Sequence, residues 1–143
     1  MIPHSLKSAR LKLTYLPNLA PLDPAAEGSA GAFQLSLDRE PVGTISLIGS
    51  KHGQAVIGYE IHPGFRRRGL ASEAVGAVLN AALGFGLTSL SAQCRSDNAA
   101  SRGVLENNGF TLLSATPWQV NGDNSLKFMV YQWIAALPES LSP

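Results

Sequence analysis

Apolar and polar residues alternate through much of the first half of the chain, which is the period expected of strands with one buried face. Leu11, Leu13 and Tyr15, for example, are separated by polar neighbours. We predict strands over this segment, residues 10–15, over the apolar stretches 32–37 and 42–48, and over residues 55–62. Asp38-Arg39-Glu40-Pro41 joins the second to the third as a hairpin turn. Consecutive strands with short connections are expected to be antiparallel.

The period becomes helical after Gly69, where apolar residues recur on one face up to Phe85. This predicts an amphipathic helix that ends near Gly84 and Gly86. A second helix is predicted over residues 99–107, with Asp97 or Asn98 as its cap. We predict the remaining strands over three segments: residues 87–94, 110–115 and 125–133.

The resulting order, β-β-β-β-α-β-α-β-β, predicts an α+β or mixed α/β fold in which helices cover a largely antiparallel sheet. The length of 143 residues suits a single domain. Residues 16–31 contain three prolines and are predicted to be a loop with one short helix near residues 24–27.

Composition narrows the function. A net charge of +1 argues against general binding to nucleic acid or to anionic membranes. The single cysteine excludes an internal disulfide, and the three scattered histidines have no spacing of a zinc site, so we expect no metal. Without a signal peptide or a long apolar run, the protein is expected to be cytoplasmic.

One segment has the pattern of a ligand site. A strand is followed by Arg66-Arg67-Arg68-Gly69-Leu70-Ala71 and then by the first helix. Free N–H groups at a helix start attract anions, Gly69 allows a close approach of the backbone, and the arginines add positive charge. These residues indicate a phosphate-binding loop, although a solvated basic helix start would have the same pattern.

The same six residues match the Q/R-x-x-G-x-G/A signature of the GNAT superfamily of N-acetyltransferases. A second segment, from Asn98 to Phe110, resembles the N-x-x-S-x-x-x-L-x-x-x-G-F pattern of the RimJ/RimL-type branch. The resemblance implies a GNAT-like twisted sheet with a V-shaped splay. It implies one domain with N-terminal strands over 10–48, an acetyl-coenzyme A-binding core over 55–117 and a last strand over 124–134.

The resemblance also implies roles for matched residues. The loop would hold the pyrophosphate of acetyl-coenzyme A through backbone amides, with Arg66 at the first signature position. The members of this loop are Arg66, Arg67, Arg68, Gly69, Leu70, Ala71 and Ser72. Backbone groups of Ile61 and His62 would pair with pantetheine, Asn98 would contact the same arm, and Ser101 would lie near the thiol sulfur. Asn98 is equally well explained as a helix cap, and Ser101 as a small packing residue.

Acetyl transfer needs a base and an acid. Glu60 is the candidate base, acting through water, unless it is only an exposed strand carboxylate; His62 is a weaker alternative. Leu105 occupies the position at which many GNAT enzymes have a tyrosine that acts as general acid. Ser101 or solvent would therefore have to protonate the thiolate of the leaving coenzyme A. Tyr131, Trp118 and Trp133 are interpreted as packing or interface residues.

The resemblance favours an N-acetyltransferase that acts on a primary amine by direct attack. The acceptor would be a protein N-terminus or a small molecule such as an amino acid, a polyamine or an antibiotic-like amine. Residues 16–31 leave little room for the two acceptor-side helices of the family, so an open cleft or the partner subunit of a homodimer would complete the site. The alternatives are a non-catalytic acyl-coenzyme A-binding domain and, more remotely, nucleic-acid binding through the arginines.

Overall fold

The computed structural model describes residues 5–16, 29–49, 52–117 and 125–135. Its β-strands are β1 (Ser5–Lys7), β2 (Leu11–Tyr15), β3 (Ala30–Leu37), β4 (Glu40–Gly49), β5 (Gln54–Ile61), β6 (Ser89–Arg95), β7 (Thr111–Pro117) and β8 (Lys127–Ile134). Its helices are η1 (Pro63–Phe65), α1 (Leu70–Ala81), η2 (Ala82–Phe85) and α2 (Ala99–Asn107).

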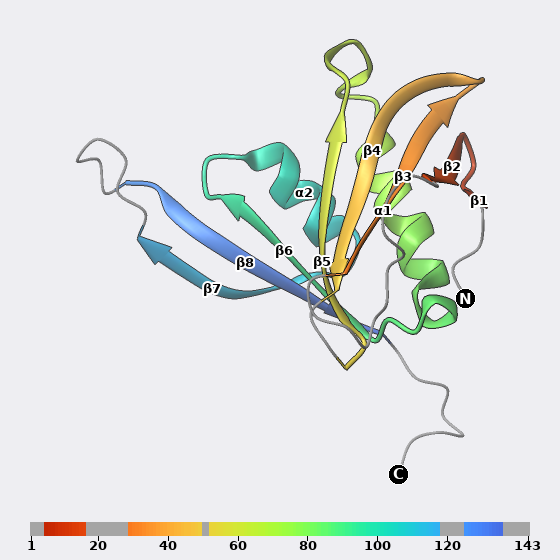
Figure 1. Cartoon of the computed structure of the whole chain (residues 1–143). Coiled ribbons are helices and arrows are strands. Elements are labelled where there is room, and N and C mark those ends of the chain that lie inside the picture. The colour runs from red at the N-terminus through yellow and green to blue at the C-terminus, as the bar shows by residue number, and fades with distance from the viewer. Residues whose placement is uncertain (1–4, 17–28, 50–51, 118–124, 136–143) are drawn as a thin grey trace.

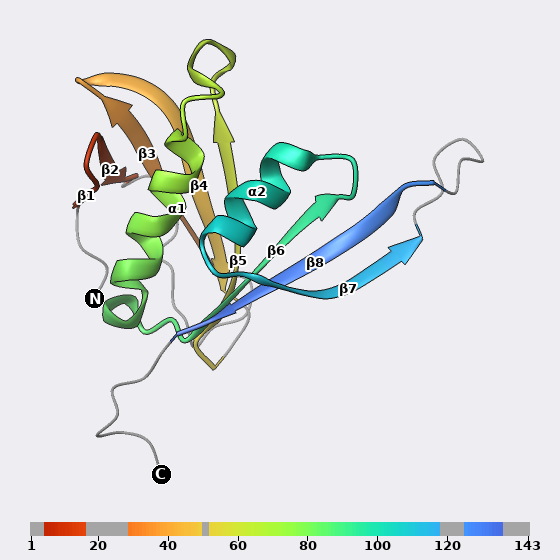
Figure 2. The same cartoon turned by 180° about the vertical axis from the view of Figure 1, so that it is seen from behind.

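The described strands form one eight-stranded sheet in the order β1-β2-β3-β4-β5-β6-β8-β7. Only β5 and β6 pair in parallel among these strands; the other neighbours are antiparallel. Helices α1 and α2 contact each other and lie together on the face of the sheet turned to the viewer in Figure 2. The predicted α+β fold is therefore confirmed.

A splay interrupts the sheet between β5 and β6. Their pairing covers only Gln54–Val56 against Ser89–Ser91, after which the two strands diverge (Figure 1). On its other side, β6 pairs along its whole length with β8. Helix α2 lies near the opening between β5 and β6. The predicted V-shaped splay is confirmed, and it leaves one edge of the second half of β5 without a neighbouring strand.

The core lies between the sheet and α1. Alternate residues of β2, β3 and β4 are fully buried, as Leu13, Phe33 and Ile45 illustrate. From the helix side, Ala74 and Val78 have no exposed surface, as the helical period predicted. Apart from Tyr131, whose ring belongs to the core, no residue with an ionisable side chain is buried in the described part of the chain.

Several predicted boundaries need correction. Strand β1 was not predicted, and Ala30 and Gly31 belong to β3 rather than to a loop. The hairpin turn is shorter than expected: Asp38 and Arg39 both have positive φ, at 49° and 71°, which is the backbone of a two-residue type I′ turn. Pro41 is accommodated in β4 because it precedes Gly43, the first residue of that strand to pair with β5.

The first helix is also shorter than predicted: its apolar pattern extends to Phe85, but α1 ends at Ala81. After Ala81 the chain tightens into η2, which ends at Gly86 with φ 84°. The predicted short helix near residues 24–27 and Trp118 lie outside the described residues. None of the helices that the structure describes has the length and apolar character needed to cross a bilayer.

Candidate cofactor and acyl-transfer site

A cavity of about 570 Å³ lies where β5, the loop before α1 and the start of α2 meet. The sequence-predicted residues that line it are Glu60, Ile61, Arg66, Arg67, Gly69, Leu70, Ala71, Ser72, Asn98 and Ser101. Residues from two motifs about 30 positions apart are thus brought to one cavity. His62 and Arg68 do not line it, whereas Tyr59, Phe65, Ala100 and Val104 do.

The loop before α1 exposes a run of backbone donors. Arg67 and Gly69 both have positive φ, at 64° and 75°, so the chain turns sharply into the helix. The Arg66 amide donates to the Pro63 carbonyl at 3.5 Å, and within the described residues the next backbone amide bonded to another backbone group is that of Glu73, which donates to the Gly69 carbonyl at 3.1 Å. The amides from Arg67 to Ser72 are therefore available to an anion at the positive end of the helix.

The three arginines of this loop have different surroundings. Arg66 Nε donates to the Ile61 carbonyl at 2.9 Å, which fastens the loop to the end of β5. The Arg68 guanidinium lies 5.6 Å from the ring centroid of Phe65, a cation–π contact outside the cavity lining. Arg67 lines the cavity itself. The arginines of this loop therefore stabilise its conformation as well as adding positive charge.

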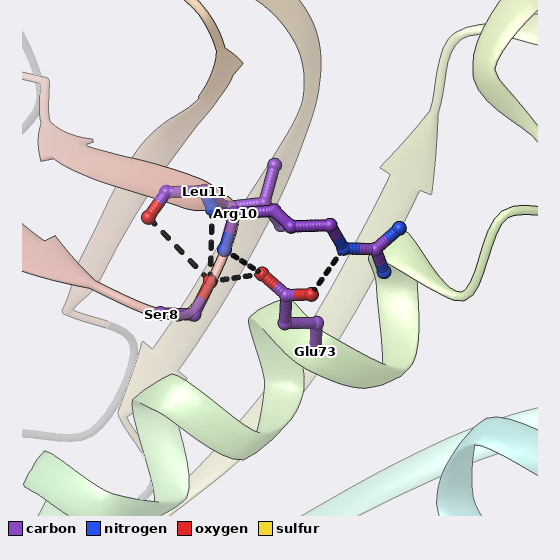
Figure 3. A network of polar contacts seen from close by, with 4 residues as sticks. All are labelled: Ser8, Arg10, Leu11 and Glu73. Atoms are coloured by element: carbon purple, nitrogen blue, oxygen red, sulfur yellow. Dashed lines mark hydrogen bonds and ion pairs between the residues drawn. The ribbon is translucent and has the colours of Figure 1, made fainter.

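A fourth arginine, not identified from the sequence, reaches the same helix start. Arg10 donates to Glu73 through Nε at 2.7 Å and through its backbone amide at 2.8 Å, and the Ser8 hydroxyl bonds the same carboxylate (Figure 3). A Cβ atom on Gly69 would lie 3.6 Å from Arg10 Nη2, so the guanidinium lies beside the loop. No local pattern links Arg10 to a helix that begins 60 residues later.

The unpaired edge of β5 can be assigned from hydrogen bonding. The amide of His62 donates to the Val42 carbonyl at 2.8 Å and so points toward β4. Because backbone groups alternate sides along a strand, those of Tyr59 and Ile61 point toward the splay. The backbone groups on this edge therefore belong to Tyr59 and Ile61, of which the Ile61 carbonyl already accepts from Arg66 Nε, and the His62 amide is engaged on the other side.

The start of α2 faces this edge. Asn98 Oδ1 accepts from the Ser101 amide at 3.0 Å, so its predicted role as a helix cap is confirmed. The Tyr59 hydroxyl lies 2.8 Å from Ser101 Oγ and 3.3 Å from the Ser101 carbonyl oxygen. Burial raises the pKa of Tyr59, although its hydrogen bond to Ser101 acts in the opposite direction. The phenol is therefore neutral at physiological pH.

Glu60 lines the cavity with an exposed side chain. Alternation along β5 directs it to the face opposite Tyr59, so the two side chains approach the cavity mouth from different sides. His62 is exposed, and Tyr131 is buried in the core, as its packing interpretation predicted. Leu105 is fully buried, and Trp133 packs partly buried against the core.

Asn108, which directly follows the predicted second helix, holds the two helices together. Its Nδ2 donates to the Val104 carbonyl at 2.8 Å and to Ser72 Oγ and O at 3.1 and 3.2 Å. A Cβ atom on Gly76 would lie 3.2 Å from Asn108 Oδ1, so a larger residue there would crowd the contact. Asn108 thereby fixes the first turn of α1 relative to α2.

Comparison with known proteins agrees with this geometry. Residues 7–111 match the family described as acetyltransferase (GNAT) domain. An uncharacterized N-acetyltransferase, YoaA, of Bacillus subtilis (strain 168) is 32% identical over 74% of this chain and 62% of its own length. The chain thus spans less than two thirds of that relative.

Solved structures show the same similarity. The RimL ribosomal L7/L12 alpha-N-protein acetyltransferase in complex with coenzyme A has a TM-score of 0.65 and 26% identity, over 73% of this chain and 62% of that one. A spermidine N-acetyltransferase from Vibrio cholerae, in complex with coenzyme A and spermine, has a TM-score of 0.66 over 74% and 66%. At 16% identity, the second comparison shows a common fold alone.

Proposed function

This chain belongs to the GNAT acetyltransferase family, and we propose from that premise that it transfers the acetyl group of acetyl-coenzyme A to a primary amine. The observation that carries the proposal is the cavity that joins the free amides of the loop before α1 to the unpaired edge of β5. It offers donors for a diphosphate at one end and strand-like backbone groups for a pantetheine amide chain at the other.

Residues along the cavity fit acetyl-coenzyme A from its pyrophosphate to its pantetheine arm. Amides from Arg67 to Ser72 would bind the pyrophosphate, with Arg67 and Arg10 adding positive charge. Tyr59 and Ile61 would offer backbone groups to pantetheine. Because Asn98 Oδ1 already caps α2, its amide nitrogen is the group that would donate to the pantetheine arm.

The chemistry follows from what surrounds the cavity mouth. Bound acetyl-coenzyme A supplies an activated acyl carbon for nucleophilic attack. Glu60, exposed at the cavity, would accept a proton from the amine through water. Ser101, on the α2 side, would protonate the leaving thiolate, because the buried Leu105 has no proton to give. No covalent intermediate on the protein is required.

The acceptor amine is the second part of the proposal. The similar RimL structure is that of a ribosomal L7/L12 alpha-N-protein acetyltransferase, which makes a peptide N-terminus the first acceptor to test. Spermidine and free amino acids are the small-molecule alternatives. The open cavity mouth is compatible with either class, and a partner subunit of a homodimer would change its shape.

The test has two readouts on the same protein. Coenzyme A and acetyl-coenzyme A are titrated in a thermal-shift assay, and thiol release is then measured with peptides, polyamines and amino acids. A melting temperature that rises with coenzyme A, together with thiol release that requires an amine, supports transfer. Stabilisation without turnover on any amine would instead indicate a non-catalytic acyl-coenzyme A-binding domain, and no stabilisation would contradict both.

A further inference from the structure

Tyr59 and Ser101 form the shortest side-chain contact between β5 and α2 that the structure records. The two hydroxyl oxygens are 2.8 Å apart, and both residues line the cavity. They come from positions 42 residues apart in the sequence and face each other across the splay. The ring of Tyr59 packs partly buried against the core, which limits where its hydroxyl can point.

The direction of this hydrogen bond decides what Ser101 can do. Each hydroxyl has one proton to donate and can accept from others. When Tyr59 donates to Ser101 Oγ, the proton of Ser101 remains for a third atom. The competing acceptor for Tyr59, the Ser101 carbonyl oxygen, is farther away at 3.3 Å. Either hydroxyl can be the donor at 2.8 Å, and only donation by Tyr59 leaves the Ser101 proton for a third atom.

We propose that Tyr59 is a positioning residue for acetyl transfer: its O–H donates to Ser101 Oγ and thereby directs the Ser101 proton to the sulfur of the leaving thiolate. This inference rests on the proposed function. It assigns to a residue of β5 part of the role that a tyrosine in α2 would otherwise perform. Leu105, at that position of α2, is completely buried.

The step balances in atoms and protons. The amine nitrogen forms a bond to the acyl carbon, and the carbon–sulfur bond breaks with its electron pair remaining on sulfur. The Ser101 hydroxyl gives its proton to that sulfur while Tyr59 gives its proton to Ser101 Oγ. Tyr59 then regains a proton from water, which equals the proton that the attacking amine has lost to Glu60 and solvent.

The surroundings keep Tyr59 protonated until it is needed. Burial raises the pKa of its phenol, and the titratable group facing it from β6 is Cys94, whose negative form would raise it further. Cys94 itself is hydrogen-bonded by Ser101 and lies near Arg102 and Glu106 of α2. Ser101 therefore lies between one phenol and one thiol, both of which are neutral at physiological pH because burial raises their pKa values.

The test compares Tyr59→Phe with Tyr15→Phe, which removes a hydroxyl from a tyrosine packed edge-on against Phe33 on the far part of the sheet. Tyr59→Phe is expected to lower kcat about 10- to 100-fold, while KM for the amine and Kd for coenzyme A change less than about twofold. Tyr15→Phe is expected to retain kcat. A purely structural role of Tyr59 would change binding and stability together with kcat.

The double variant Tyr59→Phe/Ser101→Ala supplies the second readout. If the two hydroxyls act as one unit, its kcat equals that of Ser101→Ala alone. Should Tyr59→Phe fold poorly, Ser101→Ala removes the same hydrogen bond from the α2 side and is expected to lose kcat to a similar extent.

An unchanged kcat in Tyr59→Phe, or losses that multiply in the double variant, would overturn this inference and leave the proposed function intact. A wild-type protein that transfers to no amine would overturn both.

Discussion

Arg10 and Glu73 join the N-terminal strands to the first turn of α1, with Arg10 Nε 2.7 Å from Glu73 Oε1. The same carboxylate accepts from the Arg10 amide and from Ser8 (Figure 3). Because a first-turn carboxylate also faces the positive end of the helix, this contact stabilises the segment that carries the phosphate-binding loop.

Glu73→Gln should therefore destabilise the fold, by about 1 kcal/mol at pH 7, since the half-exposed Arg10 side chain limits the ionic part. Burial opposes ionisation of Glu73, but hydrogen bonds from Ser8 and Arg10 outweigh it and lower its pKa. A lowered pKa in the folded state contributes stability above the unfolded value of about 4.3, which disappears as the pH falls through the folded value.

Urea unfolding of wild type and Glu73→Gln from pH 3 to pH 8 measures this contribution. The difference between the two proteins should be constant above about pH 5 and shrink below about pH 4. Glu40→Gln, at an exposed carboxylate where β4 begins, is the matched control and should show no such difference. A Glu73→Gln deficit that is independent of pH would contradict the assignment.

Gly69 and Gly109 offer a matched pair for the cofactor loop, because both have positive φ, at 75° and 82°. Alanine at either position meets no backbone clash but must adopt the left-handed conformation, which costs about 1 kcal/mol. Both variants should lose this stability equally. Only Gly69→Ala should weaken coenzyme A binding, by about tenfold, because the strain is placed beside the amides of the loop.

Calorimetric titration of both variants with coenzyme A distinguishes loop geometry from general destabilisation. If Gly109→Ala weakens binding as much as Gly69→Ala, the loop before α1 is not the phosphate site.

Local patterns were sufficient to predict most of the elements. The second helix was predicted to the residue, because Asn98 caps its start and Asn108-Gly109 ends it. The cavity-lining loop was identified because its chemistry lies in consecutive residues. Strand β1, with three residues, is too short to produce a period, and the hairpin turn was predicted as four residues rather than two because Asp38-Arg39 is not one of the usual type I′ pairs.

Contacts between distant residues could not be predicted in the same way. Tyr59 and Ser101 are 42 positions apart, and Arg10 and Glu73 are 63 apart. Each of these residues has an ordinary local explanation, as a strand aromatic, a small helix residue or a surface charge. Their pairing depends on how β1, β2 and β5 meet the helices, which is tertiary information that no single-segment pattern contains.

Asn108 illustrates a contact that is structural and also shapes the site. Asn108→Ala removes three donor contacts to Val104 and Ser72, so it should lower the free energy of unfolding by about 1 to 2 kcal/mol. Asn107→Ala, at the exposed neighbouring position, is the control and should be nearly neutral. Thermal unfolding compares the two, and equal melting temperatures would show that the helix–helix contact contributes nothing.

Cys94, the only cysteine of the chain, reports on the surroundings of Ser101 without any ligand. Burial raises the pKa of its thiol, while Arg102 and the hydrogen bond from Ser101 act in the opposite direction. Since the thiolate is the reactive form, a disulfide reagent at pH 8 should react more slowly with the folded protein than with the same chain in urea.

Access to the thiol also affects that rate, so the midpoint of its pH dependence is the better measurement. In wild type the midpoint should lie above that of the unfolded chain. Ser101→Ala should move it higher still, because the hydrogen bond that favours the thiolate is lost while burial remains. A midpoint that falls in Ser101→Ala would show that Ser101 does not donate to Cys94, and that its proton is directed elsewhere even without a substrate sulfur.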